Sequence, residues 1–309
     1  MVNERELKQP KTFDEQLNIL KERGIIIEDR ESAKRVLNTI NYYRLTAYAI
    51  QFKSENKYVG GIKFDTIHKL YNFDKKMKNL MIGVLESIEI STRTYIAYTL
   101  AHKYGADSYT KSEIFEDEKY HAGLMNEIEK VIKRNCREPV VIHHNDKYNG
   151  KFPIWAIIEL ISFGTLSRMY SNLKREDKRI VSRELLGLDY KLLVAGLLHL
   201  SYVRNICAHY GRLYNKKLVV FTKLHKKYNQ YNIEGNSLFA TMLSIKELMP
   251  NKDEWIIFKI QLEALIEENK DIVDLNLIGF PENWKKFWKY NTDKELFLLG
   301  IPVKAHKPS

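Results

Sequence analysis

One long stretch of the chain, from Asp65 to about Lys103, repeats in the manner of a single helix. Its apolar residues are spaced by three, four or seven positions: Ile67, Leu70, Met77, Met81, Val84 and Ile88. Such spacing places them on one face of a helix, which we expect to be buried along its whole length. We expect Asp65 to cap this helix at its N-terminus.

Helical periodicity dominates the rest of the chain as well, so we predict an all-α fold. We expect helices in residues 13–24 (with Asp14 at the cap), 29–52, 121–138, 153–173, 190–210, 236–250 and 251–270. Pro139 should end one of these helices and Pro153 should begin the next. Residues 140–152 read as a loop, residues 57–64 as a small hairpin or loop around Gly60 and Gly61, and residues 216–228 as strand or helix.

We divide the chain into an N-terminal helical segment, 1–64, a helical core, 65–215, and a C-terminal helical extension, 216–309, packed together as one unit. The aromatic and basic stretch LIGFPENWKKFW, 277–288, should pack within the extension. No segment resembles a linker, an internal repeat or a low-complexity tract.

The charge balance favours a polyanionic partner. The chain carries 50 Lys and Arg against 39 Asp and Glu, a net charge of +11. Basic residues recur in clusters, at Lys75, Lys76 and Lys78; Lys133, Arg134 and Arg137; Lys174, Arg175, Lys178, Arg179 and Arg183; Lys226 and Lys227; Lys285 and Lys286. Such surfaces attract phosphate backbones, so we expect a nucleic acid, although a solvated surface without a partner has the same composition.

Other features exclude several classes of protein. The N-terminal MVNERELKQPK lacks the apolar core of a signal peptide, and the longest apolar run, 192–198, is too short to cross a membrane. We therefore expect a soluble, cytoplasmic protein in a reducing compartment. Two cysteines cannot form a four-ligand zinc site, and there is no Walker loop or G-x-G-x-x-G motif, so we expect no cofactor.

The most informative segment is HLSYVRNICAHYGRLYN, residues 199–215, which follows that apolar run. If the helix continues to Gly211, then Ser201, Arg204, Asn205, Ala208 and Arg212 form one polar stripe on an otherwise apolar helix. Asn205 and His209 are four residues apart and are therefore neighbours on the helix surface. The helix should be buried on most sides and open along this line.

Arg, Asn and His together suit cleavage of an RNA phosphodiester by the adjacent 2′-hydroxyl. His209 would move protons as general acid or base, Arg204 would stabilise charge on the phosphate, and Asn205 would orient a group. No metal is required. The alternative is structural, since Arg and His at a helix end also complement the helix dipole.

At this point the chain resembles the HEPN superfamily, whose ribonucleases carry R-x4-6-H, and in particular the Abi family of abortive-infection proteins of the AbiD/AbiF type. The resemblance covers residues 10–290 and rests on INYYRLTAYAIQF, LYNFDKKMKNLMIGVLESIEISTRTYIAYTLAHKYG, FPIWAIIELISFGTLSRMYSNL, LSYVRNICAHYGRLYN and GFPENW. It implies an all-helical HEPN core, RNA cleavage that stalls growth of infected cells, and pairing of two motif helices across a dimer. In families of this type a small RNA antitoxin can hold the protein inactive, which makes such an RNA a candidate partner.

Further residues could complete the site. Arg212, Tyr210 and Asn215 follow the motif, and we place them with Arg93 as RNA contacts. Glu86, Glu89 and Arg93 share one helix face. Glu89 and Arg93 form either a solvated ion pair or a border of the Arg204 and His209 cleft, in which Glu89 orients His209.

Two other motifs have weaker claims. His143, His144 and Asp146 could be considered as metal ligands, but we expect no metal site there. Gly164 lies within a helical pattern, which favours close helix packing.

We therefore predict a metal-independent endoribonuclease acting on single-stranded or looped RNA in phage defence. The alternatives are an RNA-binding regulator or scaffold that holds phosphate at Arg204 and His209 without cleavage, and a partner or substrate of nucleotidyl transfer. Because a regular helix holds Arg204 and His209 about 140° apart, we expect a homodimer that assembles two such pairs around one groove.

Overall fold

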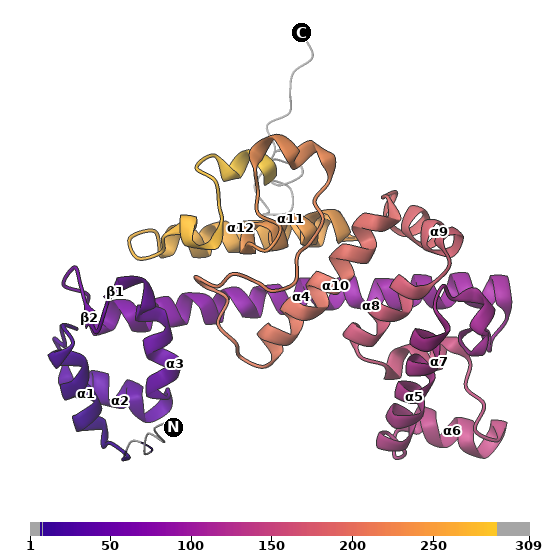
Figure 1. The fold of residues 1–309 in the computed structure, drawn as a ribbon, viewed down its shortest axis with the longest axis horizontal. Helices are drawn as coiled ribbons and strands as arrows, with labels where there is room; N and C mark the ends of the chain where they lie inside the picture. Colours follow the sequence, from indigo (N-terminus) through magenta and orange to yellow (C-terminus); the bar gives the residue numbers. More distant parts are fainter. Residues whose placement is uncertain (1–6, 8, 289–309) are drawn as a thin grey trace, which may run out of the picture.

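The computed structural model describes residue 7 and residues 9–288. Its central element is α4 (Phe64–Tyr104), which runs the length of the molecule and touches helices from every other part of it (Figure 1). The predicted long helix and the all-α class are confirmed. The cap prediction is wrong: the N-cap is Lys63, and Asp65 lies in the first turn. There its carboxylate faces the positive end of the helix dipole.

The N-terminal segment folds beside the first turns of α4 (Figure 1). It comprises α1 (Phe13–Glu22), α2 (Arg30–Thr39), α3 (Tyr42–Thr46), the 3-10 turn η1 (Ala47–Phe52) and a hairpin of β1 (Lys53–Ser54) and β2 (Lys57–Tyr58). Thr12, not Asp14, caps α1, because Thr12 and Glu15 exchange side-chain and backbone hydrogen bonds in a capping box. The hairpin turns at Glu55 and Asn56, ahead of the glycines that predicted it.

The middle of the chain packs on the far half of α4. It contains η2 (Ser108–Thr110), η3 (Ser112–Ile114), α5 (Glu118–Arg134), α6 (Pro139–Tyr148), α7 (Ile154–Leu160), α8 (Phe163–Asn172) and α9 (Arg175–Leu186). Residues 140–148 are helical, so the predicted loop is wrong. Pro139 does not end the previous helix, because α5 already ends at Arg134; it begins α6 at its first position, where a missing N–H is harmless.

The predicted helix over residues 153–173 is two helices. The chain leaves α7 at Ile161 in extended conformation, and the Ser162 hydroxyl accepts the Thr165 N–H to start α8. Ser162 and Thr165 are therefore a helix start that the apolar repeat concealed. At Gly164, at the beginning of α8, an added Cβ would have only the Ser162 hydroxyl oxygen nearby, at 3.8 Å. Close helix packing therefore does not explain this glycine.

The helix α10 (Tyr190–Ala208) crosses α4 and also contacts α8, α9 and α11 (Leu238–Leu248). Asp189 caps it by accepting the Lys191 N–H. Its close approach to α11 depends on Gly196, where a Cβ would lie 2.6 Å from a Leu248 methyl carbon. Most of α10 is buried, but it ends at Ala208, two residues before the predicted end at Tyr210.

The C-terminal segment lies against α4 and α10. After an irregular run it contains η4 (Lys226–Tyr231), α11, α12 (Lys252–Glu268), η5 (Leu275–Ile278) and η6 (Trp284–Trp288). Residues 216–225 are neither strand nor helix. The aromatic stretch 277–288 packs by ring contacts on α11 and α12, as Trp288 stacks near Phe239 and meets Trp255 edge-on. The rest of the predicted extension, 289–309, and residues 1–6 and 8 lie outside the described residues.

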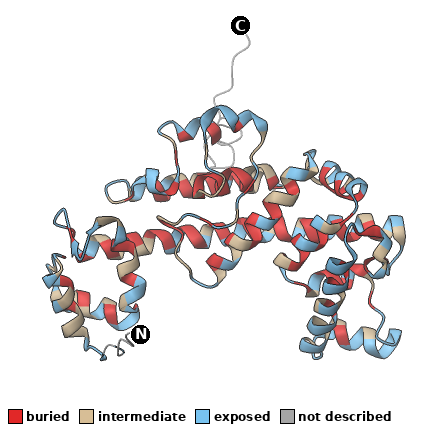
Figure 2. Cartoon of the chain, in the orientation of Figure 1, coloured by how far each residue is buried: buried red, intermediate tan, exposed pale blue. Residues whose placement is uncertain are grey.

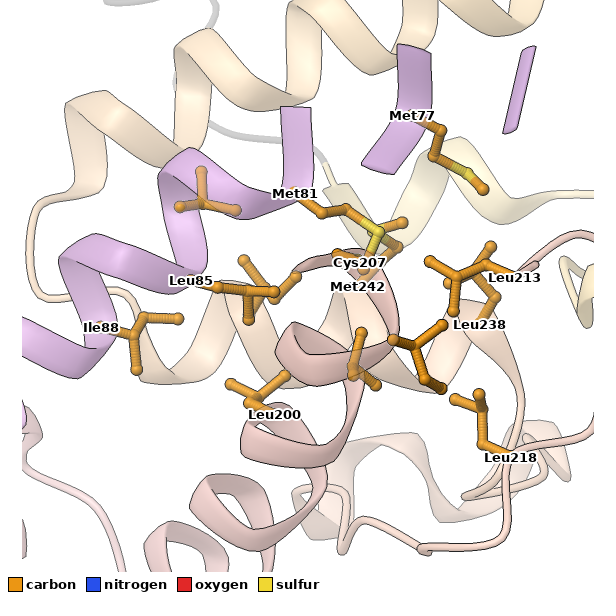
Figure 3. Packing of buried hydrophobic residues seen from close by; sticks show 14 of the residues in the cluster. Met77, Met81, Leu85, Ile88, Leu200, Cys207, Leu213, Leu218, Leu238 and Met242 are labelled. Atoms are coloured by element: carbon orange, nitrogen blue, oxygen red, sulfur yellow. The ribbon is translucent and has the colours of Figure 1, made fainter. Parts of the chain in front are cut away.

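The buried hydrophobic residues form one core, and Figure 2 shows buried residues along the whole length of α4. Figure 3 shows where it meets the site: Met77, Met81, Leu85 and Ile88 of α4 lie beside Leu200 and Cys207 of α10, with Leu213, Leu218, Leu238 and Met242 around them. Apolar packing against α4 therefore holds the end of α10 in place, in addition to its polar contacts. The division into three segments stays a prediction.

Among the described helices, none is by itself long and apolar enough to cross a membrane, although α9 and α10, joined at a bend of 79°, together meet that test of length and composition.

Candidate active site at the end of α10

The end of α10 is a Schellman turn that carries His209 and Tyr210. The Tyr210 N–H donates to the Cys207 carbonyl at 3.1 Å, and the Gly211 N–H donates to the Ile206 carbonyl at 2.8 Å. His209 is the C-cap residue, and Tyr210 takes the left-handed position with φ +58°. No side chain fits at Gly211, because a Cβ would lie 2.9 Å from the Ile206 side chain.

This geometry changes the predicted relation between Arg204 and His209. Because His209 follows the last helical residue, the angle expected for a regular helix does not fix its side chain. Its backbone N–H still donates to the Asn205 carbonyl at 3.0 Å, so the two predicted neighbours stay in one turn. His209, Asn205 and Tyr210 are exposed, with Tyr210 at 72%.

Arg204 is partly exposed and leans toward α4. Its Nε lies 3.8 Å from Glu89 Oε2, and its Nη1 lies 3.4 Å from the Asn205 side-chain oxygen. The residue of α10 that Glu89 contacts is therefore Arg204, whereas we expected Glu89 to orient His209. The contact holds the guanidinium beside α4 while 43% of the side chain stays open to solvent.

Arg93 is buried, so it does not face RNA at the surface as predicted, and the solvated ion pair predicted for Glu89 and Arg93 is wrong. Both residues are buried, and the Arg93 guanidinium donates to Glu89 and to the Ile158 carbonyl. Ile158 lies in the last turn of α7, where carbonyls have no partner within the helix. Arg93 therefore ties α7 to α4. Glu86 is exposed one turn away, so the three residues do not share one open face.

A buried carboxylate holds the chain that follows the turn. Asp74 on α4 is fully buried and accepts the backbone N–H groups of Tyr214 at 2.8 Å and Leu213 at 3.2 Å. It also accepts the Tyr48 hydroxyl at 2.6 Å and forms an ion pair with Lys78 at 3.0 Å. Burial, then the Asp74 carboxylate, raises the pKa of Tyr48, so its hydroxyl stays a donor.

Two cations bind carbonyls of the turn itself. The Lys78 ammonium donates to the Gly211 carbonyl at 2.8 Å, and the Arg44 guanidinium donates to the Tyr210 carbonyl at 2.6 Å. The turn is thus held by α3 on one side and α4 on the other. Of the residues that hold the turn, Lys78 was predicted only as part of a basic cluster, and Asp74, Tyr48 and Arg44 were not predicted at all. The signal was Asp74 itself, a charge between Leu70 and Met77 on the predicted buried face.

Arg212 and Asn215 also have structural partners. The Arg212 guanidinium donates to the carbonyls of Tyr214 and Asn215, both at 2.9 Å. Asn215 has φ +50° and is half-buried. Both residues shape the loop that Asp74 holds, and Arg212 has further N–H groups that could meet a ligand.

The remaining predicted features lie elsewhere. His143, His144 and Asp146 belong to α6, and no group of three or more potential metal-binding side chains occurs in the described part of the chain. The basic clusters are not all surface: Lys78 is buried at the turn, and Lys178 is buried against Glu116 at 2.9 Å. Burial also raises the pKa of the Cys207 thiol to about 12, which removes it as a nucleophile at neutral pH.

The arrangement presents an imidazole, an amide, a guanidinium and a phenol at the end of a buried helix, on a turn held by buried charges. An imidazole can transfer protons, and a guanidinium can bind phosphate oxygens. No curated protein and no solved structure matches the chain. One family model matches residues 35–215, the span from the middle of α2 to the last residue of the loop that Arg212 shapes. That span is narrower than the predicted resemblance over 10–290, but it includes the whole site and more than half of the chain, so the chain belongs to the family of Abi-like proteins.

Proposed function

We propose that this chain is a metal-independent endoribonuclease of abortive-infection phage defence. Membership of the Abi-like family points to abortive infection. The observation that carries the nuclease proposal is the exposure of Arg204, Asn205 and His209 at the end of a helix that is otherwise mostly buried. The resemblance to R-x4-6-H ribonucleases of the HEPN superfamily supports the same reading.

The proposed chemistry is attack of the RNA 2′-hydroxyl on the adjacent phosphorus. One histidine accepts the proton of the 2′-hydroxyl as the 2′-oxygen bonds to phosphorus, and the bond from phosphorus to the 5′-oxygen breaks. A general acid then supplies a proton to that 5′-oxygen. Arg204 stabilises the negative charge that develops on the phosphate oxygens. The products are a 2′,3′-cyclic phosphate and a 5′-hydroxyl.

A second copy of the chain would supply the second histidine. Leu198, Tyr202 and Asn205 follow one another at helical spacing and form the open line of α10, because Ser201 of the predicted polar stripe is buried. Leu198 is 48% exposed, so an apolar surface continues directly into the polar residues of the site. Pairing of two such helices around a two-fold axis would bury Leu198 and bring the two His209 residues to one groove.

The test is incubation of purified protein with labelled single-stranded RNA in EDTA. We expect cleavage at the same rate as without EDTA, with 2′,3′-cyclic phosphate and 5′-hydroxyl termini. Products with 5′-phosphate ends, or activity lost in EDTA, would contradict the mechanism. Binding of RNA without cleavage under either condition would instead support the RNA-binding regulator that the sequence left as an alternative.

A further inference from the structure

A second site lies in the part of the fold that the proposed function does not use. A pocket of about 570 Å³ opens between α6 and the start of α7. Lys151 is part of its lining, but most of the lining consists of rings, those of His143, His144, Tyr148, Phe152 and Trp155. Trp155 is 55% exposed and Tyr148 is 45% exposed, large fractions for aromatic side chains gathered in one place.

The rings of this pocket hold one another in place. His144 stacks on Phe152 with ring centroids 5.1 Å apart and an angle of 20°, and Tyr148 lies 5.4 Å from His144 and 5.5 Å from His143. The Nδ1 atom of His144 lies 2.8 Å from the Val140 carbonyl. Since a carbonyl only accepts, that nitrogen carries a proton and the ring is fixed. The pocket is therefore a preformed set of aromatic faces.

The surroundings carry excess positive charge. Lys151 lines the pocket, and the Lys147 ammonium lies 5.6 Å from the centroid of the Tyr148 ring. The one carboxylate in the lining, Asp107, lies 3.4 Å from the Lys111 ammonium, which offsets its charge. Aromatic faces within a basic surface are the combination that binds the unpaired bases of a nucleic acid strand.

We propose that this pocket binds one unpaired base of single-stranded RNA by stacking, with the flanking phosphates on Lys147 and Lys151. The volume lies within the range of small-ligand sites and suits one base with its ribose. The inference rests on the proposed function only in taking RNA as the partner. It narrows the substrate class to strands with an unstacked base, because a base within a duplex cannot enter the pocket.

Tryptophan fluorescence can test the pocket directly. Of the four tryptophans, Trp155 is exposed, whereas Trp255, Trp284 and Trp288 are buried. The probe is a 2′-O-methyl oligonucleotide, which lacks the nucleophilic hydroxyl and is not cut by the proposed chemistry. We expect it to quench the Trp155 emission on binding, and an abasic oligonucleotide of equal length to bind more weakly without quenching.

Variants provide the second measurement, by anisotropy of the labelled oligonucleotide. Trp155→Ala should weaken binding about tenfold, within the range for loss of one stacked base. Phe221→Ala, which removes an aromatic residue of similar exposure (62%) from the chain after α10, should bind like the wild type. If Trp155→Ala does not fold, the comparison of intact and abasic probes on the wild type decides.

Several results would overturn the proposal. These are equal binding of intact and abasic probes, wild-type affinity of a folded Trp155→Ala variant, or equal quenching by a free mononucleotide at the same concentration, which would assign the pocket to nucleotides. Because the probe resists cleavage, failure of the nuclease proposal does not affect this readout. Conversely, a protein that cleaves RNA but whose Trp155 emission is not quenched would refute base binding in the pocket and leave the nuclease proposal intact.

Discussion

Tyr210 carries the most costly backbone conformation at the candidate site. A left-handed residue at this position of a Schellman turn is ordinarily glycine, because a Cβ is disfavoured there by roughly 1–2 kcal/mol. Here the glycine comes one residue later, at Gly211, where close packing on Ile206 excludes a side chain. The phenol of Tyr210 is 72% exposed, so no packing explains its presence. A contact with RNA is the role we propose for it.

Tyr210→Gly should therefore separate stability from function. We expect the free energy of unfolding, measured by urea denaturation, to rise by about 1 kcal/mol, because the strain of the left-handed conformation is relieved. RNA cleavage should fall. Asn215→Gly is the matched control. Asparagine tolerates the left-handed conformation better than tyrosine does, so this variant should raise the free energy of unfolding by less. A destabilised Tyr210→Gly would show that the phenol supports the fold.

Asp74 is the residue on which the loop after the turn depends. Asp74→Asn removes the charge that offsets buried Lys78 and turns an amide donor toward backbone N–H groups. We expect a loss of about 3 kcal/mol in the free energy of unfolding. The control is Asp65→Asn, which breaks an exposed pair with Lys69 at the same spacing on the same helix and should change stability little. Equal effects of the two variants would contradict the assigned role of Asp74.

At the scale of elements, the crossing of α10 and α11 depends on the absence of a side chain at Gly196. Gly196→Ala should lower the free energy of unfolding by about 1–3 kcal/mol, because its Cβ would overlap buried Leu248. Gly83→Ala should raise it by about 0.5–1 kcal/mol, since that exposed glycine in the middle of α4 has nothing within 4 Å. Chemical denaturation of both variants gives the comparison. Shifts of the same sign would refute the close approach of α10 and α11.

The elements that the sequence predicted well are those whose apolar repeat is long. α4 was predicted to within a residue at each end, and all six apolar residues used to predict it are buried. The errors occur where a local signal competes with the repeat. Asn, Asp and Gly suggested a loop where α6 forms, and the repeat through 153–173 concealed the Ser162 cap that divides α7 from α8. Caps and breaks depend on single hydrogen bonds, which periodicity does not register.

The site was predictable only in part for the same reason. Arg204, Asn205 and His209 lie together because they are close in sequence. The contacts that hold their turn come from Arg44, Tyr48, Asp74 and Lys78, which are more than a hundred residues away. Arg93 was misplaced because spacing on a helix does not show which face another helix covers, and α7 covers this one.

At the scale of the whole molecule, the proposed homodimer should depend on the open line of α10. Leu198→Glu places a charge on that apolar surface and should shift the protein from dimer to monomer in sedimentation velocity, with a parallel loss of RNA cleavage. Val219→Glu, at a residue of 74% exposure in the chain after α10, is the control and should leave the dimer intact. A wild-type monomer that cleaves RNA would contradict the shared groove.

The central claim is that His209 acts in chemistry and not in folding. The most direct measurement is the rate of RNA cleavage by purified His209→Ala beside its melting temperature. We expect the rate to fall by a factor of about 10²–10⁴, the usual contribution of a general acid or base, with the melting temperature nearly unchanged because the side chain is exposed. His102→Ala, another exposed histidine, should retain the wild-type rate. A His209→Ala variant that cleaves RNA normally, or one whose melting temperature falls sharply, would contradict the account.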